Sequence, residues 1–378
     1  MRRKAYLTLE NGRVFEGFGF GASREAAGEV VFTTAMTGYL ETLTDKSHYG
    51  LIIAHAFPLI GAYGLIPQDF ESDGPQVGGY IVKEICDTPS NFRSQGRLDD
   101  FLAERGVAGL CGIDTRALIK TLRDQGVMNG VIGSAPLGAG QLPEIKAHRL
   151  KGAIGAVTCA APVTHGGADA KRRIAIWDFG VKRGITGALL ERNCSVIQMP
   201  GGSSAEDIAA LDPDGVLLST GPGDPADNPD IIRNIARFIE TGKSGGAPVP
   251  VFGIGIGHEL LALARGARVT KLKFGHRGAN QPARAAADGR VYMTSQNHGY
   301  AVVAESVDPA VAGLNFINVN DGTCEGLDYR DYPAFSVQFH PEASAGPRDA
   351  LFLFDRFIGA ADNYRIDRRP EAMIFHAT

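Results

Sequence analysis

The chain has 378 residues, of which 44% are hydrophobic, so it can form packed cores, and disorder over its whole length is excluded. Its 38 basic and 42 acidic residues are intermixed and give a net charge of −4, which indicates neither nucleic acid nor a membrane as the main partner. The N-terminal arginines are not followed by an apolar signal-peptide core, and no apolar run is long enough for a transmembrane helix, so we expect a cytoplasmic protein. The five cysteines are widely spaced and form no C-x-x-C motif, which predicts a reducing compartment and neither a disulfide framework nor a zinc site.

The first 157 residues are predicted to form an α+β domain with substantial β structure. Residues 6–9 and 13–15 flank Asn11-Gly12, a pair typical of a β-hairpin turn, and residues 29–36 are rich in β-branched side chains. Residues 98–105 and 115–126 have apolar side chains at helical spacing. Residues 158–171 are small, polar and contain proline and glycine, so we expect them to form an interdomain linker.

Residues 172–378 are predicted to form a second domain of α/β class. Apolar strands are expected at residues 174–179, 195–199, 216–220 and 249–252, and helices at 182–192, 203–211, 229–241 and 258–265. Ser203 and Glu206 are interpreted as the capping box of the second of these helices. Alternation of apolar strands with helices indicates a parallel sheet covered by helices on both faces. The remaining residues are predicted to form hairpins and a helix at 350–358.

Two glycine-rich turns are predicted at the carboxyl ends of strands, where open α/β sheets bind ligands. They are S-T-G-P-G-D-P at 219–225 and F-G-I-G-I-G-H-E at 252–259. The second has the strand–turn–helix layout of a nucleophile elbow, which directs backbone N–H groups toward one point and suits an oxyanion. Its central residue, Gly255, has no side chain.

Other motifs are weaker or fail. The pair His340 and Glu342 can form an oriented base, although H-P-E taken alone is more typical of a solvated turn. Residues 296–300 are predicted to form a loop. The glycine turn lacks the third glycine of a dinucleotide fingerprint, and the chain contains no P-loop motif. The pair His258-Glu259 does not extend to H-E-x-x-H, because position 262 is Ala262.

Taken in order, the motifs resemble one family closely: the small, glutamine-amidotransferase subunit of carbamoyl-phosphate synthetase. The resemblance covers nearly the whole chain and includes the N-terminal segments 28–48, 90–93 and 113–126 and the C-terminal segments 177–185, 219–225, 252–267, 273–280, 295–300 and 340–350. The C-terminal segments alone imply a class I amidotransferase with a flavodoxin-like, mostly parallel sheet. The N-terminal segments narrow the resemblance to this subunit.

The resemblance implies the partners and the reaction. Members of the family hydrolyse glutamine through a Cys-His-Glu set, and the ammonia passes to a large subunit that makes carbamoyl phosphate from bicarbonate with ATP and Mg, for arginine or pyrimidine biosynthesis. This chain itself is expected to need no cofactor. By motif position, His340 is the general base and Glu342 its orienting carboxylate. The backbone of Gly221 and Ile256 is expected to form the oxyanion hole, and the residues expected to bind glutamine are Ser47, Gly221, Gly223, Ile256, Glu259, Asn297, Gly299 and Tyr300.

Two positions depart from the family pattern. The family motif reads G-I-C-L-G-H-Q, whereas this chain reads G-I-G-I-G-H-E, so Gly255 stands at the nucleophile position and Glu259 at that of a substrate-contacting glutamine. Glycine offers no atom to form the acyl-enzyme. A carboxylate at position 259 would lose a donor and place negative charge near the substrate carboxylate, unless Glu259 is solvated and without a role. None of the cysteines is expected to replace the nucleophile, and Cys324 is predicted to be a core residue.

Three interpretations remain open at this point. The chain is a small subunit whose own glutaminase is lost or impaired, a binding or regulatory pseudoenzyme that holds glutamine or another ligand, or a glutaminase whose nucleophile was removed by design. Measured glutamine turnover, calorimetric binding of glutamine and the Gly255→Cys reversion distinguish them.

Overall fold

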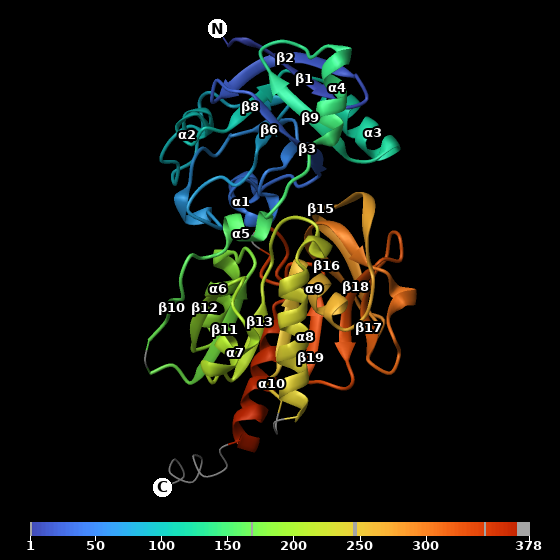
Figure 1. The fold of residues 1–378 in the computed structure, drawn as a ribbon. Helices are drawn as coiled ribbons and strands as arrows, with labels where there is room; N and C mark the ends of the chain where they lie inside the picture. The colour runs from blue at the N-terminus through green and yellow to red at the C-terminus, as the bar shows by residue number, and fades with distance from the viewer. Residues whose placement is uncertain (1, 168, 245–247, 344, 369–378) are drawn as a thin grey trace. The chain divides into compact units, whose positions relative to one another are not determined.

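The computed structural model describes residues 2–167, 169–244, 248–343 and 345–368. The chain divides into two compact units, Met1–Ala153 with Leu272–Ala279, and Ile154–Lys271 with Asn280–Thr378. Figure 1 shows the chain and labels many of its helices and strands by their numbers in chain order. None of the helices in the described ranges is long and apolar enough to cross a membrane.

The first unit contains a closed β-barrel. Its strands run in the order β1-β2-β8-β6-β4-β3-β9, and they are β1 (Lys4–Leu9), β2 (Val14–Gly21), β3 (Ala26–Thr33), β4 (Ile52–His55), β6 (Gly79–Ile81), β8 (Ala108–Cys111) and β9 (Met128–Gly133). A separate parallel pair consists of β5 (Leu59–Ile60) and β7 (Glu84–Ile85). The helices of this unit are α1 (Tyr39–Thr44), η1 (Lys46–His48), η2 (Pro67–Asp69), α2 (Leu98–Glu104), α3 (Thr115–Gln125), η3 (Ala139–Gln141) and α4 (Leu142–Ala147).

The hairpin and helices predicted for the first unit are confirmed. At the Asn11-Gly12 turn, Gly12 has φ +83°, and the Asn11 side chain accepts a hydrogen bond from the Arg13 N–H at 2.9 Å. Asp114 caps α3 by accepting from the Ala117 N–H at 2.9 Å. Alternate residues of β2 are buried, as expected of a strand with one face on a core.

The second unit is built on a ten-stranded sheet in the order β10-β12-β11-β13-β14-β19-β18-β17-β15-β16. Its strands are β10 (Val163–His165), β11 (Arg172–Asp178), β12 (Cys194–Pro200), β13 (Gly215–Leu218), β14 (Val251–Ile254), β15 (Val269–Ala285), β16 (Val291–Val302), β17 (Ala312–Asn318), β18 (Cys324–Tyr329) and β19 (Ala334–Val337). The central pairs from β12 to β19 are parallel, whereas β10, β17 and β18 pair antiparallel with their neighbours. Within the stretch predicted as a linker, β10 pairs with β12.

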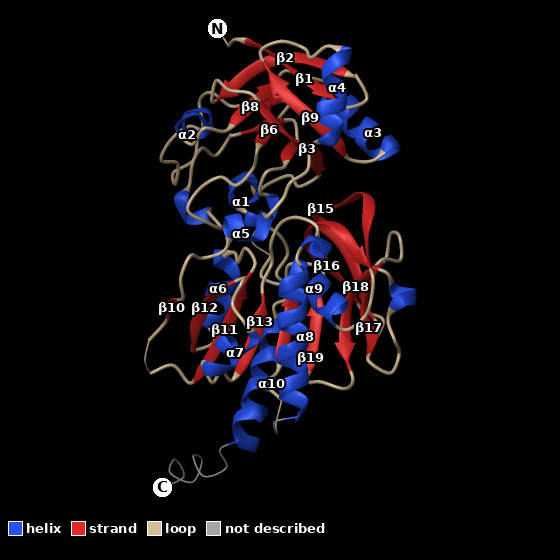
Figure 2. Cartoon of the chain, viewed as in Figure 1, coloured by secondary structure: helices blue, strands red, loops and turns tan. Residues whose placement is uncertain are grey.

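Helices cover both faces of this sheet, as the strand–helix alternation predicts. The helices are α6 (Arg183–Leu190), α7 (Ala205–Ala210), η4 (Pro225–Asp227), α8 (Pro229–Ser244), α9 (Ile256–Ala264), η5 (Ala304–Ser306) and α10 (Phe352–Arg368), and α5 (Ala153–Val157) spans the boundary of the two units. Neighbouring strand residues belong to opposite cores: Ala175 and Trp177 pack with α7, α8 and α9, whereas Ile174 and Ile176 pack with α6 and α10. Figure 2 shows these helices against the strands.

Candidate functional site

The carboxyl ends of the parallel strands bring the predicted motifs of the second unit to one edge. Strand β13 leads into residues 219–225, its neighbour β14 leads into the elbow, and β19, next to β14, leads into residues 338–342. Because parallel strands end on the same edge, the glycine turns and the H-P-E motif lie together, as predicted.

Gly255 occupies the centre of the elbow between β14 and α9. Its φ is +60° and its ψ is −120°, and its N–H donates to the Val337 carbonyl at 3.0 Å. A Cβ built on Gly257 would lie 2.2 Å from the Leu218 carbonyl oxygen, so only glycine fits there. The close approach of α9 to β13 therefore depends on Gly257, and the elbow keeps its shape without a nucleophile.

The space at Gly255 itself is open to a side chain. A Cβ built there would meet Thr220 Cγ2 at 3.4 Å, an ordinary contact. Only the positive φ disfavours an L side chain at this position. The elbow therefore has room for a cysteine side chain at this position.

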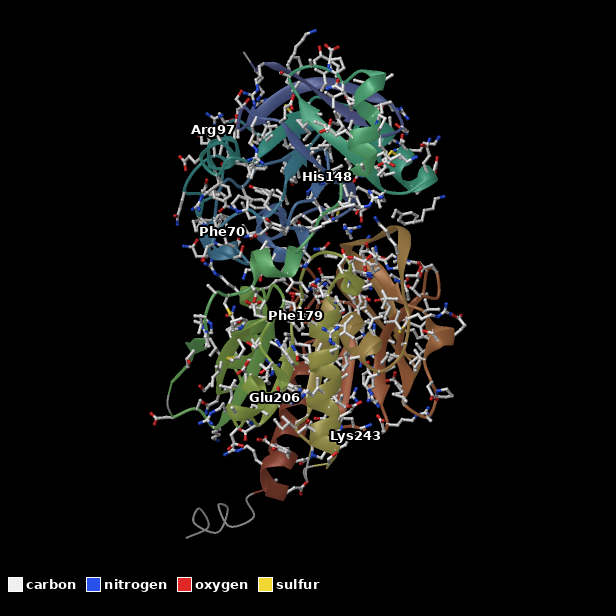
Figure 3. All side chains as sticks on the ribbon, in the orientation of Figure 1. Phe70, Arg97, His148, Phe179, Glu206 and Lys243 are labelled. Atoms are coloured by element: carbon white, nitrogen blue, oxygen red, sulfur yellow. The ribbon has the colours of Figure 1, made fainter. Side chains whose placement is uncertain are left out.

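The two amides expected to form the oxyanion hole have no hydrogen-bond acceptor among the described residues. Ile256 is the first residue of α9, so its N–H has no helical partner. Gly221 runs against Phe179, whose carbonyl oxygen would lie 2.1 Å from an added Cβ. Phe179 is fully buried and is labelled in Figure 3. Gly223, in the same turn, has φ +94°. The N–H groups of Gly221 and Ile256 are therefore available to a ligand.

His340 and Glu342 form a buried, hydrogen-bonded pair. His340 Nδ1 lies 2.9 Å from Glu342 Oε1, and the side chains are 3% and 1% exposed. The interpretation of H-P-E as a solvated turn is therefore wrong, because the strand end carries both residues under the surface. Since Nδ1 bonds the carboxylate, Nε2 is the nitrogen that can take a proton from a ligand.

Lys182 is a member of this group that sequence reasoning missed. Its Nζ lies 3.0 Å from Glu342 Oε1, and it is buried just before α6. Burial alone would raise the pKa of Glu342, but Lys182 and His340 outweigh it and lower the pKa to about 2. A lysine at the end of the mainly apolar stretch W-D-F-G-V-K was the available sequence signal, because a buried lysine requires a partner.

A cavity of about 420 Å³ adjoins Glu342. It is lined by Gly184, Gly187, Ala188 and Glu191 on one side and by Glu342, Ala343, Ala345, Gly346, Arg348 and Leu351 on the other. The second oxygen of Glu342, Oε2, is buried and has no hydrogen-bond partner among the described residues. Space thus reaches the triad carboxylate from the side of α6.

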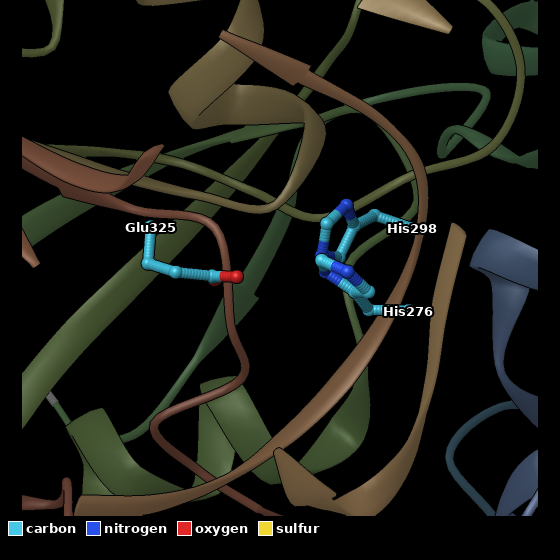
Figure 4. Close-up of side chains that lie close together, drawn as sticks. All are labelled: His276, His298 and Glu325. Carbon is cyan, nitrogen blue, oxygen red and sulfur yellow. The ribbon is translucent and has the colours of Figure 1, made fainter. Parts of the chain in front are cut away.

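Asn297, Gly299 and Tyr300 lie on strand β16, so the loop predicted at 296–300 is wrong. Alternation along the strand puts Gln296 and His298 on one face and Asn297 and Gly299 on the other. Gln296 bridges His298 Nε2 at 3.0 Å and Glu325 Oε2 at 2.9 Å. Figure 4 draws His298 and Glu325 together with His276. This buried network fixes the strand that carries the predicted substrate residues.

Glu259 is buried, so the alternative that it is solvated is wrong. It is 3% exposed, and Gln338 Nε2 donates to its Oε1 at 3.0 Å. Burial raises its pKa to about 8, the bond from Gln338 opposes this, and the charge of Asp224 adds to it. The carboxyl group is therefore predominantly neutral at pH 7.

Ser47 and two of the cysteines complete the set of residues considered in the sequence. Ser47 lies in η1 of the first unit, where its N–H donates to Asp45 Oδ1 at 2.8 Å. Cys324 begins β18 and is buried, as predicted. Cys159 is a cysteine near the carboxyl end of β11, where its N–H donates to Asp178 Oδ2 at 2.8 Å, with β13 between that strand and β14.

Both parts of the chain match known families. Residues 7–132 match the CPSase domain of the carbamoyl-phosphate synthase small chain, and residues 175–360 match the class I glutamine amidotransferases. A protein of Bacillus thuringiensis subsp. konkukian named carbamoyl phosphate synthase small chain is 47% identical over 363 residues, covering 96% of this chain and 97% of the relative. Proteins of the same name from Syntrophotalea carbinolica and Symbiobacterium thermophilum are 47% and 45% identical, each covering 96% of this chain and 99% of the relative.

Proposed function

The chain belongs to the family of carbamoyl phosphate synthase small chains, and we propose that it serves as the small subunit beside a large subunit but has lost or nearly lost its own glutaminase activity. The single observation that carries this proposal is Gly255 at the centre of an otherwise complete elbow. The large subunit would bind ATP and Mg and make carbamoyl phosphate in the cytoplasm.

The missing side chain removes the covalent step. Hydrolysis of a glutamine amide through an acyl-enzyme requires a thiolate that attacks the amide carbon, while the base delivers a proton to the departing ammonia. His340 and Glu342 supply the base, and the Gly221 and Ile256 amides supply the oxyanion donors, but no described atom at position 255 can attack. Without a nucleophile, the oxyanion donors and the base can sustain only a small fraction of the rate of glutamine hydrolysis that an enzyme with a nucleophile reaches.

The retained residues would then serve assembly and ligand binding rather than turnover. A complex of this chain with a large subunit would use free ammonia, with the small subunit holding the partner in its working conformation. Of the described side chains around the elbow, Lys182, His340 and Glu342 form one buried charge-balanced group, which stabilises the edge of the sheet without a substrate.

The test is an assay of the purified chain and of its complex with the large subunit. We expect no glutamate to be released from glutamine by either, and we expect the complex to form carbamoyl phosphate from ammonium, bicarbonate and ATP. Glutamate release at rates typical of enzymes, about 1 per second or faster, would refute the proposal.

A ligand-binding pseudoenzyme is the second candidate function. The open space at Gly255, where a Cβ would lie 3.4 Å from Thr220, favours it, because a ligand slightly larger than glutamine would fit beside the free amides. Under this alternative the chain would bind glutamine or an analogue without turnover and would act as a regulatory subunit. Calorimetry with glutamine at millimolar concentration tests it, and no heat of binding would count against it.

A further inference from the structure

Polar side chains of the second unit form a buried hydrogen-bonded chain along strand β16. Thr294, Gln296 and His298 lie on one face of the strand, and each contacts the next. Gln296 also reaches across to Glu325 on β18. All of these side chains are buried, so their hydrogen-bond partners decide which of their atoms carry hydrogens.

The side-chain amide of Gln296 can point in only one direction. The Thr294 hydroxyl donates its single hydrogen to the Gln281 carbonyl at 2.8 Å, so it can only accept from Gln296 Nε2, which lies 3.1 Å away. The same amide nitrogen donates to Glu325 Oε2 at 2.9 Å. Because two acceptors hold the nitrogen on this side, Gln296 Oε1 must face His298.

Both ring nitrogens of His298 consequently need a hydrogen. Nδ1 lies 2.6 Å from the Tyr300 carbonyl oxygen, and Nε2 lies 3.0 Å from Gln296 Oε1. Both partners are oxygens that only accept hydrogen bonds, so each ring nitrogen acts as a donor. A histidine with two N–H donors is the imidazolium cation. This pattern of hydrogen bonds therefore requires a positive charge on a buried side chain.

Glu325 supplies the matching negative charge. Its Oε1 accepts from Asn318 Nδ2 at 2.9 Å, and the Asn318 amide is itself oriented, because its Oδ1 accepts from the Asn320 N–H at 2.9 Å. Both oxygens of Glu325 thus accept from amide N–H groups, as those of an ionised carboxylate do. An isolated buried charge is costly, whereas the two opposite charges joined through Gln296 compensate each other.

The elements that pack against β16 carry other titratable groups. They are His258 and Glu259 on α9, Lys271, Lys273, His276, Arg277 and Arg284 on β15, Cys324, Asp328 and Tyr329 on β18, and His340 after β19, with Tyr292 and Tyr300 on β16 itself. Glu325 is linked to the His298 ring through one amide, whereas Asp328 on the same strand forms an ion pair with Arg356 at 2.9 Å. Figure 4 shows His276 with His298 and Glu325, so the two histidines have to be resolved separately.

We propose that His298 is a positioning residue that stays protonated at neutral pH, with Glu325 as its counter-ion, and that this proton holds residues 296–300 in strand β16. Loss of the proton would leave either the Tyr300 carbonyl or Gln296 Oε1 facing a nitrogen lone pair. A buried acceptor that faces another acceptor destabilises the segment that carries it. The segment therefore loosens above the pH at which His298 titrates.

The same segment carries predicted ligand residues. Asn297 and Gly299 alternate with Gln296 and His298 along the strand. Alkaline pH would therefore act on the predicted ligand site as well. That consequence rests on the proposed function, whereas the proton on His298 does not, so the two can fail separately.

Two-bond ¹H–¹⁵N correlation spectra of the full chain labelled with ¹⁵N-histidine, recorded from about pH 6 to about 9, test the protonation directly. The His298 ring is assigned by through-space contacts of its hydrogens with Gln296 and Tyr300. We expect both ring nitrogens to carry a hydrogen at about pH 7, and the ring to titrate above about pH 7.5, against about 6.5 for an ordinary histidine. A titration midpoint below about pH 7.5 would overturn the proposal.

Glu325→Gln removes the counter-ion, and Asp328→Asn is the matched control, because it removes a charge from the same strand outside the network. We expect the His298 midpoint to fall by about one pH unit or more in Glu325→Gln and to stay within about 0.3 unit in Asp328→Asn. No shift in Glu325→Gln, or the same shift in both variants, would overturn the role of Glu325. The wild-type spectra decide the protonation of His298 even if Glu325→Gln does not fold.

Hydrogen exchange followed by mass spectrometry tests the strand itself. After correction for the intrinsic rise of amide exchange with pH, the protection of residues 296–300 should fall above the His298 midpoint by up to about tenfold per pH unit, while that of β11 stays constant. In Glu325→Gln this fall should begin at lower pH. Constant protection of residues 296–300 through the titration of His298 would refute its positioning role. None of these measurements uses glutamine, so their outcome is independent of the proposed function.

Discussion

At the scale of single residues, Gly255 gives the elbow its backbone geometry but provides no nucleophilic side chain. The elbow has a hydrogen bond from Gly255 to Val337 and space for a Cβ beside Thr220, and only its positive φ disfavours an L side chain. Under the proposed function, the loss is confined to the side chain. A change of one residue is therefore reversible in principle, provided that Glu259 does not itself block the substrate.

Gly255→Cys should restore glutamine hydrolysis at pH 7 by at least about 10³-fold, with Glu259 left unchanged, because base, oxyanion donors and space are already present. The L side chain at φ +60° should cost about 1–3 kcal/mol of unfolding free energy. Glutamate release and thermal unfolding measure the two effects. The matched control, Gly255→Ala, should lose the same stability and gain no activity. Activity that appears only when Glu259→Gln is added would contradict the expectation.

Motif spacing predicted which residues lie together at this edge of the sheet, but not their protonation. His340, Glu342 and Gly255 follow from motif spacing, and the parallel strand order explains why they meet. The neutral state of Glu259 and the ion pair of Lys182 depend on burial and on partners 79 and 160 positions away, Gln338 and Glu342. Spacing along the chain carries no information about such contacts.

At the scale of elements, the strand–elbow–helix unit is held by backbone contacts that only glycine permits. Gly257→Ala would press a methyl group against the Leu218 carbonyl at 2.2 Å, so α9 must move away from β13. We expect a loss of about 2 kcal/mol or more in unfolding free energy, measured by denaturant titration. Gly359→Ala on α10 is the matched control, since an added Cβ there meets nothing within 4 Å and should stabilise the helix slightly. Equal effects of the two substitutions would contradict this account of the elbow.

Helices and strands could be predicted from the sequence where a local signal, such as a helix cap or a hairpin turn, determines where they begin or end. The α3 helix follows its Asp114 cap and the hairpin follows Asn11-Gly12. The capping box of α7, by contrast, is formed by Ser204 and Asp207, one residue later than predicted, because two serines stand side by side. Residues 296–300 lack strand-like composition, yet they form part of β16, whose buried network with Glu325 compensates for weak local preference.

At the scale of the whole molecule, each unit contains a buried histidine that is held neutral. In the barrel, His55 Nδ1 bonds the Tyr80 hydroxyl at 2.8 Å and Nε2 lies 2.7 Å from the Ala35 carbonyl. In the second unit, His258 Nδ1 bonds the Ser336 hydroxyl at 2.7 Å. Burial lowers the pKa of His55 to about 4 and that of His258 to about 3, from 6.5.

Both units should therefore lose stability on mild acidification. Below pH 6.5 these two histidines bind a proton in the unfolded chain but stay neutral in the folded chain. The free energy of unfolding should therefore fall by about 1.4 kcal/mol per histidine for each pH unit down to about 4. Differential scanning calorimetry between pH 7 and about 5 measures this, in a range where ordinary carboxylates remain largely ionised. The variants His55→Gln and His258→Asn each keep a hydrogen-bonding group but remove the group that titrates. Each should reduce the pH dependence of the unfolding temperature of its own unit and leave that of the other unit unchanged. A slope that survives both substitutions would place the acid sensitivity outside these two histidines.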